Sequence, residues 1–280
     1  MKSPAHAETV LACSDPRLAE AVRYVLENPG KQLRARLVHA AYRVFKQEAH
    51  QGLYTVATAI EWLHAYSLVH DDLPAMDDDA VRRGRPTVHM AFDEATAILV
   101  GDGLQAAAIS LLAQDDSLPE TTRLRLITLI AGAVGLGGMV GGQALDMSGE
   151  GQALDIEDLQ LIHRQKTGAL IRAAVLGGAL CADASETDID RLGRYAAAVG
   201  LGFQIADDVL DVTESSSTLG KTAGKDADVG KSTYVRTLGL KGAQAAAELQ
   251  LQEAVDCLLP FGEAAEELRT MASAMIRRNH

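Results

Sequence analysis

Aromatic residues are scarce in this sequence: they make up 4% of its 280 residues, although hydrophobic residues as a whole make up 48%. Strands are rich in aromatic and β-branched side chains, whereas packed helices are rich in alanine and leucine. No run of alternating valine, isoleucine and threonine marks a strand, and apolar residues recur at helical spacing in segments such as 53–70 and 192–212. The composition therefore excludes a protein built mainly on sheets and predicts an all-α fold.

Positive charge is also in deficit, because 26 Lys and Arg residues stand against 38 Asp and Glu residues and give a formal net charge of −12. A negative chain repels nucleic acid and anionic membrane surfaces, so neither is expected as a partner. Cysteine is rare: Cys13, Cys181 and Cys257 are widely spaced and match no disulfide or metal-ligand pattern. We therefore expect reduced thiols and a cytoplasmic protein.

Long uninterrupted apolar runs and low-complexity linkers are absent as well. The most apolar segment, residues 126–142, is interrupted by six glycines, and its apolar part falls short of the roughly 20 residues that a membrane-spanning helix needs. The turns marked by proline, glycine and serine do not separate domains. We predict one domain, residues 1–280, without a stable membrane span.

What the sequence has in abundance is aspartate, and the first cluster places five aspartates between Asp71 and Asp79. On an ideal helix Asp71 and Asp77 point about 120° away from each other, so their carboxylates converge only where the helix is broken. Pro74 supplies the break, because proline removes a backbone donor and clashes with the preceding turn. The pattern predicts a helix end at which Asp71 and Asp77 reach one point.

A second cluster lies in the segment QIADDVLD, where Gln204, Asp207, Asp208 and Asp211 fall on one face of an otherwise apolar helix. Buried polar groups are costly without compensation. Hard divalent cations prefer oxygen ligands, and Mg²⁺ completes its shell with water and substrate phosphates. Two such clusters favour Mg²⁺ sites over the alternative of solvated or helix-capping acidic turns.

Phosphate groups also need cations from the protein, and lysine and arginine residues stand near several turns. Taken singly, each is an ordinary surface charge. The glycine, serine and lysine content of residues 213–232 suits a loop that closes over phosphates. The candidates are Lys31, Arg34, Arg82, Arg83, Lys166, Lys221 and Lys231.

These residues stand in motifs that resemble the trans-isoprenyl diphosphate synthases, and most closely the bacterial farnesyl diphosphate synthases. The likeness covers nearly the whole chain, through HAYSLVHDDLPAMDDD, RRGRPTVH, GGQALDM, HRQKTGALIRAA, QIADDVLDV and LGKTAGKDADVGKSTY, in this order. The resemblance implies an all-α isoprenoid synthase fold around a deep cavity, usually a homodimer, with three Mg²⁺ ions between the aspartates and an allylic diphosphate.

The resemblance also implies a role for each matching residue. Asp71, Asp77 and Asp207 correspond to Mg²⁺ ligands, with Asp72 and Asp211 in support. Lys31, Arg34, His64 and Arg83 match the isopentenyl diphosphate site. Arg82, Lys166 and Lys231 match residues that hold the allylic diphosphate, and Thr167, Gln204 and Lys221 complete that side of the pocket.

One motif departs from the family. Where the relatives have GGKRxRP, this chain has PGKQLRA, with Pro29, Gln32 and Ala35 in place of glycine, arginine and proline. The departure concerns the isopentenyl side, and Lys31 and Arg34 are kept.

The length of the product is expected to depend on Tyr66, the fifth residue before Asp71. A helix rises about 1.5 Å per residue, which places Tyr66 roughly 7.5 Å deeper than Asp71. By resemblance, an aromatic ring there accompanies a fifteen-carbon product, so we expect farnesyl diphosphate, with Ser67 as a second residue that affects length. Geranylgeranyl or geranyl diphosphate synthesis, a terpene cyclase, a metal phosphohydrolase and a non-catalytic subunit are the alternatives.

Overall fold

The computed structural model describes residue 4, residues 6–213 and residues 232–277. The chain forms two compact units. Unit 1 comprises Met1–Arg36 with Glu48–Thr128, and unit 2 comprises Leu37–Gln47 with Leu129–His280. The single domain expected from the sequence stays a prediction.

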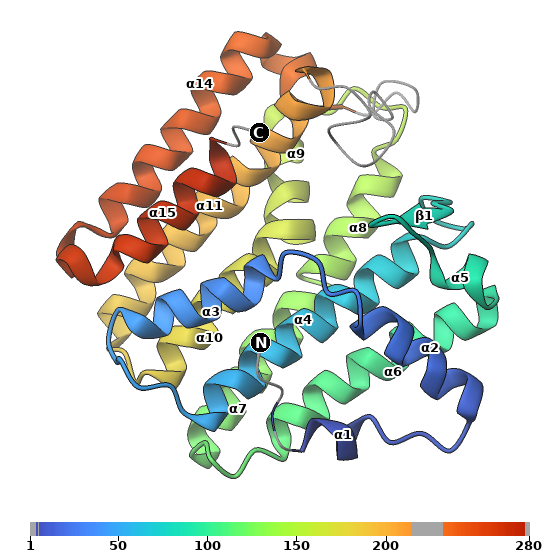
Figure 1. The fold of residues 1–280 in the computed structure, drawn as a ribbon. Coiled ribbons are helices and arrows are strands. Elements are labelled where there is room, and N and C mark those ends of the chain that lie inside the picture. The colour runs from blue at the N-terminus through green and yellow to red at the C-terminus, as the bar shows by residue number, and fades with distance from the viewer. Residues whose placement is uncertain (1–3, 5, 214–231, 278–280) are drawn as a thin grey trace. The chain divides into compact units, whose positions relative to one another are not determined.

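Helices make up most of the described chain (Figure 1). The first part of the chain contains α1 (Ala7–Val10), α2 (Pro16–Leu26), α3 (Leu33–Arg43), α4 (Gln51–Asp71), β1 (Val81–Arg82), β2 (Arg85–Pro86), α5 (Val88–Ala91), α6 (Glu94–Ala113) and α7 (Glu120–Val134). The second part contains α8 (Met139–Ser148), α9 (Ile156–His163), the π-helical turn η1 (Arg164–Gly168), α10 (Ala169–Cys181), α11 (Glu186–Thr213), α14 (Tyr234–Cys257), the 3-10 segment η2 (Leu259–Ala265) and α15 (Glu266–Ile276). The predicted all-α fold is confirmed, with one two-stranded hairpin added to it.

Several helices begin where the sequence provides a capping side chain. Asp15, Asp93 and Asp155 each accept a hydrogen bond from the backbone N–H three residues later, and Thr233 does the same for α14. Such caps satisfy N–H groups that have no partner within the helix. They explain why α2, α6, α9 and α14 start where they do.

The core of unit 1 is built on α4, which packs against α6 along its length (Figure 1). Thirteen of its residues, from Gly52 to Val69, are buried. A helix that is apolar on every side belongs inside a protein, and α4 carries the first aspartate cluster at its C-terminal end.

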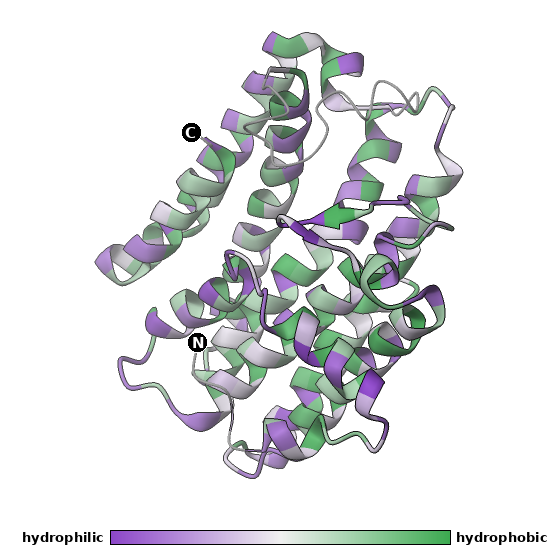
Figure 2. Ribbon diagram, turned by 45° about the vertical axis from the view of Figure 1, so that its right-hand side comes forward, coloured by the Kyte–Doolittle hydropathy of each residue, from purple (hydrophilic) through white to green (hydrophobic). Residues whose placement is uncertain are grey.

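In unit 2 the longest helix, α11, packs against α10, α14 and α15. Figure 2 shows that hydrophobic and hydrophilic residues both occur along the long helices, as expected where one side of a helix packs against neighbours. The second aspartate cluster lies near the C-terminal end of α11, next to the undescribed residues 214–231.

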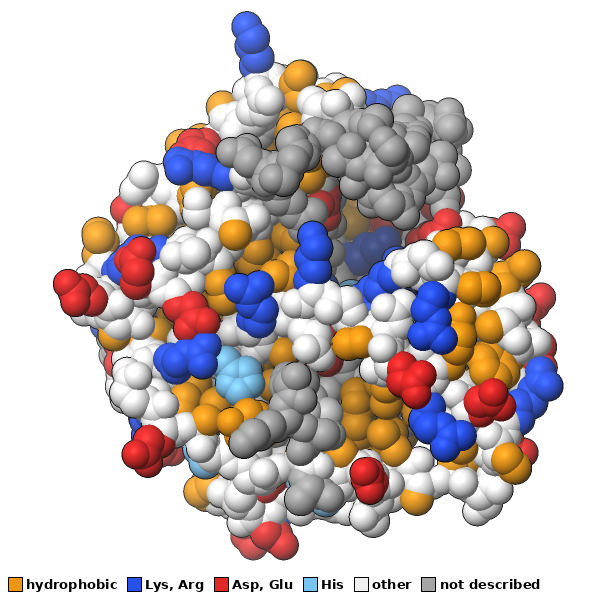
Figure 3. Space-filling model, in the orientation of Figure 1, with side chains coloured by type: hydrophobic (Ala, Val, Ile, Leu, Met, Phe, Trp, Pro, Cys, Tyr) orange, Lys and Arg blue, Asp and Glu red, His pale blue; other side chains and the backbone are white. Residues whose placement is uncertain are grey.

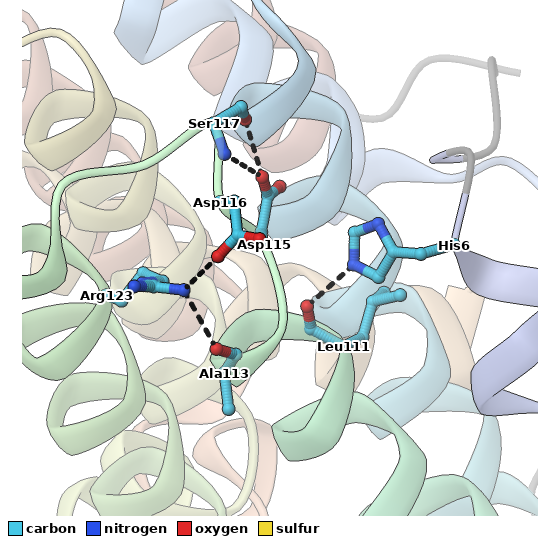
Figure 4. A network of polar contacts seen from close by, with 7 residues as sticks. All are labelled: His6, Leu111, Ala113, Asp115, Asp116, Ser117 and Arg123. Atoms are coloured by element: carbon cyan, nitrogen blue, oxygen red, sulfur yellow. Dashed lines mark hydrogen bonds and ion pairs between the residues drawn. The ribbon is translucent and has the colours of Figure 1, made fainter.

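Polar contacts join the N-terminal segment of unit 1 to the last turn of α6 and fix the connection between α6 and α7 (Figure 4). The His6 ring nitrogen Nε2 lies 2.9 Å from the carbonyl oxygen of Leu111. Asp115 accepts hydrogen bonds from the backbone and hydroxyl groups of Ser117, and Arg123 donates to Asp116. The connection is thus fixed by side chains within it and by Arg123 of α7.

Two helical stretches of the described chain are long and apolar enough to cross a bilayer, by length and composition alone. Glu94–Ala113 has a mean hydropathy of 1.6 and is 50% buried, and Glu120–Ser148 has a mean hydropathy of 1.7 and is 28% buried. Core helices of soluble proteins have the same properties. The absence of a membrane span stays a prediction.

Candidate active site

The first aspartate cluster begins at the end of α4, whose last residue is Asp71. The chain then turns through Leu73 and Pro74, and the backbone N–H of Asp77 donates to the carbonyl oxygen of Asp71 at 2.8 Å. Asp78 donates in the same way to Leu73, at 3.2 Å. The predicted helix break is therefore confirmed, and it returns the backbone of Asp77 to the end of the helix.

Asp72 lies inside this turn and binds an arginine of the following hairpin. Its Oδ1 accepts from Nε of Arg82 at 2.6 Å, and only 5% of its side chain is exposed. Burial raises the pKa of Asp72, while the Arg82 charge and hydrogen bond oppose that rise. Arg82 also lies 3.5 Å from Asp79. The acidic turn thus fixes Arg82, and the supporting metal role of Asp72 stays a prediction.

The hairpin of β1 and β2 turns at Arg83 and Gly84, which have φ values of 52° and 74°. Positive φ at both central residues is the geometry of a two-residue hairpin turn whose twist matches its strands. Arg83 donates through Nη1 to the carbonyl oxygen of Asn28 at 2.6 Å. Gly30, with φ of 67°, leaves room for this contact, because a Cβ there would lie 2.5 Å from the guanidinium carbon of Arg83.

Unit 1 contains a cavity of about 280 Å³, lined in part by Gln32, His64, Arg82 and Arg83. The structure therefore brings His64 and Arg83, two of the four residues predicted for isopentenyl diphosphate, to one cavity. Burial, followed by the charges of Arg34, Arg83 and Arg82, lowers the pKa of His64 well below its ordinary value. His64 is a neutral imidazole there, able to donate one hydrogen bond and accept another.

The other two predicted residues of this group lie in the loop and helix start beside the cavity. Lys31 is exposed and Arg34, in the first turn of α3, is half-buried. The charge of Arg34 acts on both His64 and Glu61. Gln32 has a φ of 49°, a left-handed conformation that is uncommon outside glycine. The departure from the family motif thus lies in a sharply turned segment.

Glu61, which was not among the residues predicted from the sequence, also lines the cavity and is 9% exposed. Its Oε1 accepts from the backbone N–H of Ala35 at 2.8 Å. Burial raises the pKa of Glu61, and the Ala35 hydrogen bond and the charges of Arg34 and Arg83 oppose the rise. The signal was present in the sequence: Glu61 is a charged residue within the apolar segment 53–63.

The second aspartate cluster belongs to unit 2. Gln204 donates through Nε2 to Oδ2 of Asp207 at 3.4 Å. Asp208 is buried, and its Oδ2 accepts from the backbone N–H of Tyr234, the first residue of α14, at 2.8 Å. Asp211 is 8% exposed. Asp208 thus ties α14 to α11, and the metal role of Asp207, with Asp211 in support, stays a prediction.

Lys166 and Thr167 lie in η1, the π-helical turn between α9 and α10. Turns of this kind occur frequently at functional sites. Lys166 pairs with Asp146 of α8 at 2.6 Å, and Thr167 is buried. The pair is close because α8 approaches η1 at Gly142, where a Cβ would lie 2.2 Å from the backbone nitrogen of Lys166.

Tyr66 is 5% exposed, and its ring meets the ring of His70 edge to face, with 5.9 Å between centroids. Ser67 donates to the carbonyl oxygen of His64 at 2.9 Å. Both residues precede Asp71 on α4, and their role in setting product length stays a prediction. Lys221 and Lys231 lie outside the described residues.

The donors of both clusters fit Mg²⁺. In the part of the chain that the structure describes, no group of three or more His, Cys, Asp or Glu residues forms a ready metal site. Mg²⁺ seldom uses an all-protein cage, since one or two carboxylates, water and substrate phosphates complete its shell. Carboxylates such as Asp71 and Asp77 at one helix end, beside cationic residues, meet that requirement.

Comparison with known proteins identifies the family. The model for polyprenyl synthetase matches residues 15–267. The chain is 45% identical over 269 residues to farnesyl diphosphate synthase of Escherichia coli (strain K12), covering 94% of this chain and 89% of the relative. The chain belongs to the polyprenyl synthetase family.

Solved structures agree with this assignment. An FPP/GFPP synthase from Zymomonas mobilis superposes with a TM-score of 0.86 at 38% identity, covering 98% of this chain and 94% of that one. A geranyltransferase from Helicobacter pylori, solved with magnesium and isoprenyl diphosphate, gives a TM-score of 0.84 at 31% identity, covering 98% and 93%. The all-α fold of this chain is thus the fold of isoprenyl synthases.

Proposed function

We propose that this chain is a Mg²⁺-dependent prenyltransferase that condenses isopentenyl diphosphate with dimethylallyl or geranyl diphosphate and gives farnesyl diphosphate. One observation carries the proposal: in unit 1, His64, Arg82 and Arg83 line one cavity together with Asp72, at the start of the aspartate turn. A cavity with cationic groups and neighbouring carboxylates suits a diphosphate that is bound partly by the protein and partly through Mg²⁺.

Isopentenyl diphosphate binds on the side of Lys31, Arg34, His64 and Arg83. Guanidinium groups hold diphosphate oxygens with two parallel hydrogen bonds. The Arg83 side chain is held by its bond to Asn28, so less conformational freedom is lost on binding. His64 enters the site uncharged and donates a hydrogen bond.

The leaving diphosphate of the allylic substrate interacts with Arg82 and Lys166, and with Lys221 and Lys231. The described members of this set are paired with carboxylates, Arg82 with Asp72 and Lys166 with Asp146. These pairs hold each cation in place before the substrate arrives. Positive groups positioned in advance stabilise charge as it grows in the transition state.

Asp71, Asp77 and Asp207 are the proposed Mg²⁺ ligands, three ions in all, with Asp72 and Asp211 in support. When bound, Mg²⁺ offsets the negative charge that develops on the leaving diphosphate. The carboxylates act by binding and orientation, and no protein nucleophile takes part.

In the reaction the allylic carbon–oxygen bond breaks and diphosphate leaves. The isopentenyl double bond then forms the new carbon–carbon bond with the allylic cation, and a proton is lost to restore a double bond. The oxygens of Thr167 and Gln204 stabilise the cation, and Thr167 is one of the buried residues of the turn η1. The released diphosphate accepts the proton.

We also propose that the protein is a cytoplasmic homodimer without a membrane span and without a nucleic-acid partner. Apolar side chains on α6 support a protein interface, since Ile98 is 46% and Leu99 is 53% exposed. The net charge of −12 disfavours nucleic acid. Acidic and basic side chains both occur on the face shown in Figure 3.

Incubation of the purified protein with labelled isopentenyl diphosphate and one allylic diphosphate at a time tests the proposal. We expect consumption of both substrates and a fifteen-carbon diphosphate, identified by chromatography after dephosphorylation. A cyclic hydrocarbon formed from an allylic diphosphate alone would indicate a cyclase, and release of inorganic phosphate alone would indicate a phosphohydrolase. Either result would contradict the proposal.

A further inference from the structure

Helix α3 begins directly after a residue with an unusual backbone conformation. Gln32, the residue before it, has a φ of 49°, whereas capping residues normally adopt extended backbone. The first N–H groups of a helix need partners from elsewhere in the protein. Here the partner is Glu61 of α4, whose Oε1 accepts from the backbone N–H of Ala35 at 2.8 Å.

The donor of this bond exists because position 35 is not proline. Proline, which the related motif has at this place, carries no backbone N–H. The backbone of Arg34 also hydrogen-bonds to Glu61, so two successive N–H groups of the first turn of α3 point to one carboxylate. Such an arrangement is an N-cap supplied by a different helix.

Glu61 is the only carboxylate among the buried residues of α4, a helix that the structure describes in full. A buried charge needs hydrogen bonds and opposite charges around it. The groups that act on Glu61 are the two backbone N–H groups and the guanidinium groups of Arg34 and Arg83. Glu61 therefore contacts the start of the helix that carries Arg34 and offsets the charge of two arginines.

We propose that Glu61 is a positioning residue for isopentenyl diphosphate: by capping α3 from α4, it holds Arg34 beside the cavity. This inference rests on the proposed function, because Arg34 is the residue through which Glu61 acts. Glu61 itself touches no substrate. As a carboxylate it would repel a diphosphate, so its benefit comes through the arginines.

The test compares Glu61→Leu, which removes the acceptor, with Glu61→Gln, whose amide oxygen still accepts from Ala35. Calorimetry measures the binding of isopentenyl diphosphate, and steady-state kinetics measures KM for both substrates. We expect Glu61→Leu to weaken isopentenyl diphosphate binding roughly five- to tenfold, with kcat and the allylic KM changed about twofold or less. Glu61→Gln should restore most of the affinity.

A double-mutant cycle shows whether Glu61 acts through Arg34. In the Arg34→Ala background, Glu61→Leu should change the dissociation constant by less than about twofold, since the residue it positions is gone. Thr55→Val is the matched control: Thr55 is a buried polar residue of α4 that does not line this cavity. It should leave the affinity unchanged.

An undiminished affinity in Glu61→Leu, or equal effects with and without Arg34, would overturn the positioning role. If Glu61→Leu does not fold, Glu61→Ala replaces it in the same cycle, because it leaves room for water at the helix start. A wild-type protein that does not bind isopentenyl diphosphate would instead contradict the proposed function, so the two failures are distinguishable.

Discussion

The backbone N–H of Asp77 donates to the carbonyl oxygen of Asp71 across 2.8 Å, and this bond closes the turn that ends α4. The two aspartates are six positions apart in the sequence, and a continuous helix would direct them apart. Because the helix stops at Asp71, before Pro74, the chain folds back. The proposed binding of Mg²⁺ by Asp71 and Asp77 depends on this reversal of the chain.

His64 should make stability depend on pH. Burial and the charges of Arg34 and Arg83 lower the pKa of His64 well below 6.5, so the unfolded chain takes up a proton at a higher pH than the folded protein. Stability is therefore lost as the pH falls below about 6.5, and the loss is complete below the folded-state pKa.

In the His64→Gln variant, the melting temperature should change less with pH than in the wild type. The range to measure is roughly pH 5–8, where histidine titrates. His89→Gln controls for the loss of one imidazole elsewhere in unit 1. A slope unchanged by His64→Gln would show that His64 is not held uncharged.

Gly142→Ala should destabilise unit 2, because the added Cβ would lie 2.2 Å from the backbone nitrogen of Lys166. We expect a loss of about 1–3 kcal/mol, the range for overpacked sites. Gly132→Ala is the matched control, since a Cβ there meets nothing within 4 Å. It should be neutral or stabilising by up to about 1 kcal/mol.

Denaturant unfolding monitored by circular dichroism gives both values. Equal effects from the two substitutions would mean that α8 and η1 do not approach closely at Gly142.

Arg34→Ala should raise KM for isopentenyl diphosphate more than KM for the allylic substrate, by about tenfold or more, because a charge-assisted hydrogen bond to phosphate is lost. Arg36→Ala is the control, an exposed arginine two residues further along the same helix. Initial rates with one substrate varied at a time separate the two constants. Equal increases in both would place Arg34 in a different subsite.

Tyr66→Ala should lengthen the product, since removal of a buried ring at this depth of α4 opens space along the growing chain. We expect products of about twenty carbons or more, since about 7.5 Å of helix separates Tyr66 from Asp71. Ser67→Phe should have the opposite effect and favour a ten-carbon product. Chromatography of the dephosphorylated products measures both, and an unchanged fifteen-carbon product from Tyr66→Ala would assign the length to another residue.

Local patterns predicted a large part of this structure. The apolar spacing of residues 53–70 predicted the helix α4, and Pro74 predicted that this helix ends before it. These features depend on neighbours in sequence, through helical periodicity and the missing N–H of proline.

Relationships between distant segments could not be predicted in the same way. The bond from Ala35 to Glu61 and the bond from Tyr234 to Asp208 each join residues 26 positions apart. Whether a carboxylate binds a metal ion, an arginine or a helix start depends on which segment packs against it. The hairpin turn was also missed, because Arg83 at positive φ is an unusual choice for a position that favours asparagine or glycine.

The rate of farnesyl diphosphate formation from isopentenyl and geranyl diphosphates, measured against Mg²⁺ concentration, tests the central claim most directly. Asp77→Asn is compared with Asp78→Asn, an exposed neighbour at a φ of 51°, a conformation that asparagine tolerates. We predict that the wild type is inactive in EDTA and recovers with Mg²⁺, that Asp77→Asn is slower by about 100-fold or more, and that Asp78→Asn resembles the wild type. Formation of the product without Mg²⁺, or equal rates for the two variants, would contradict the account.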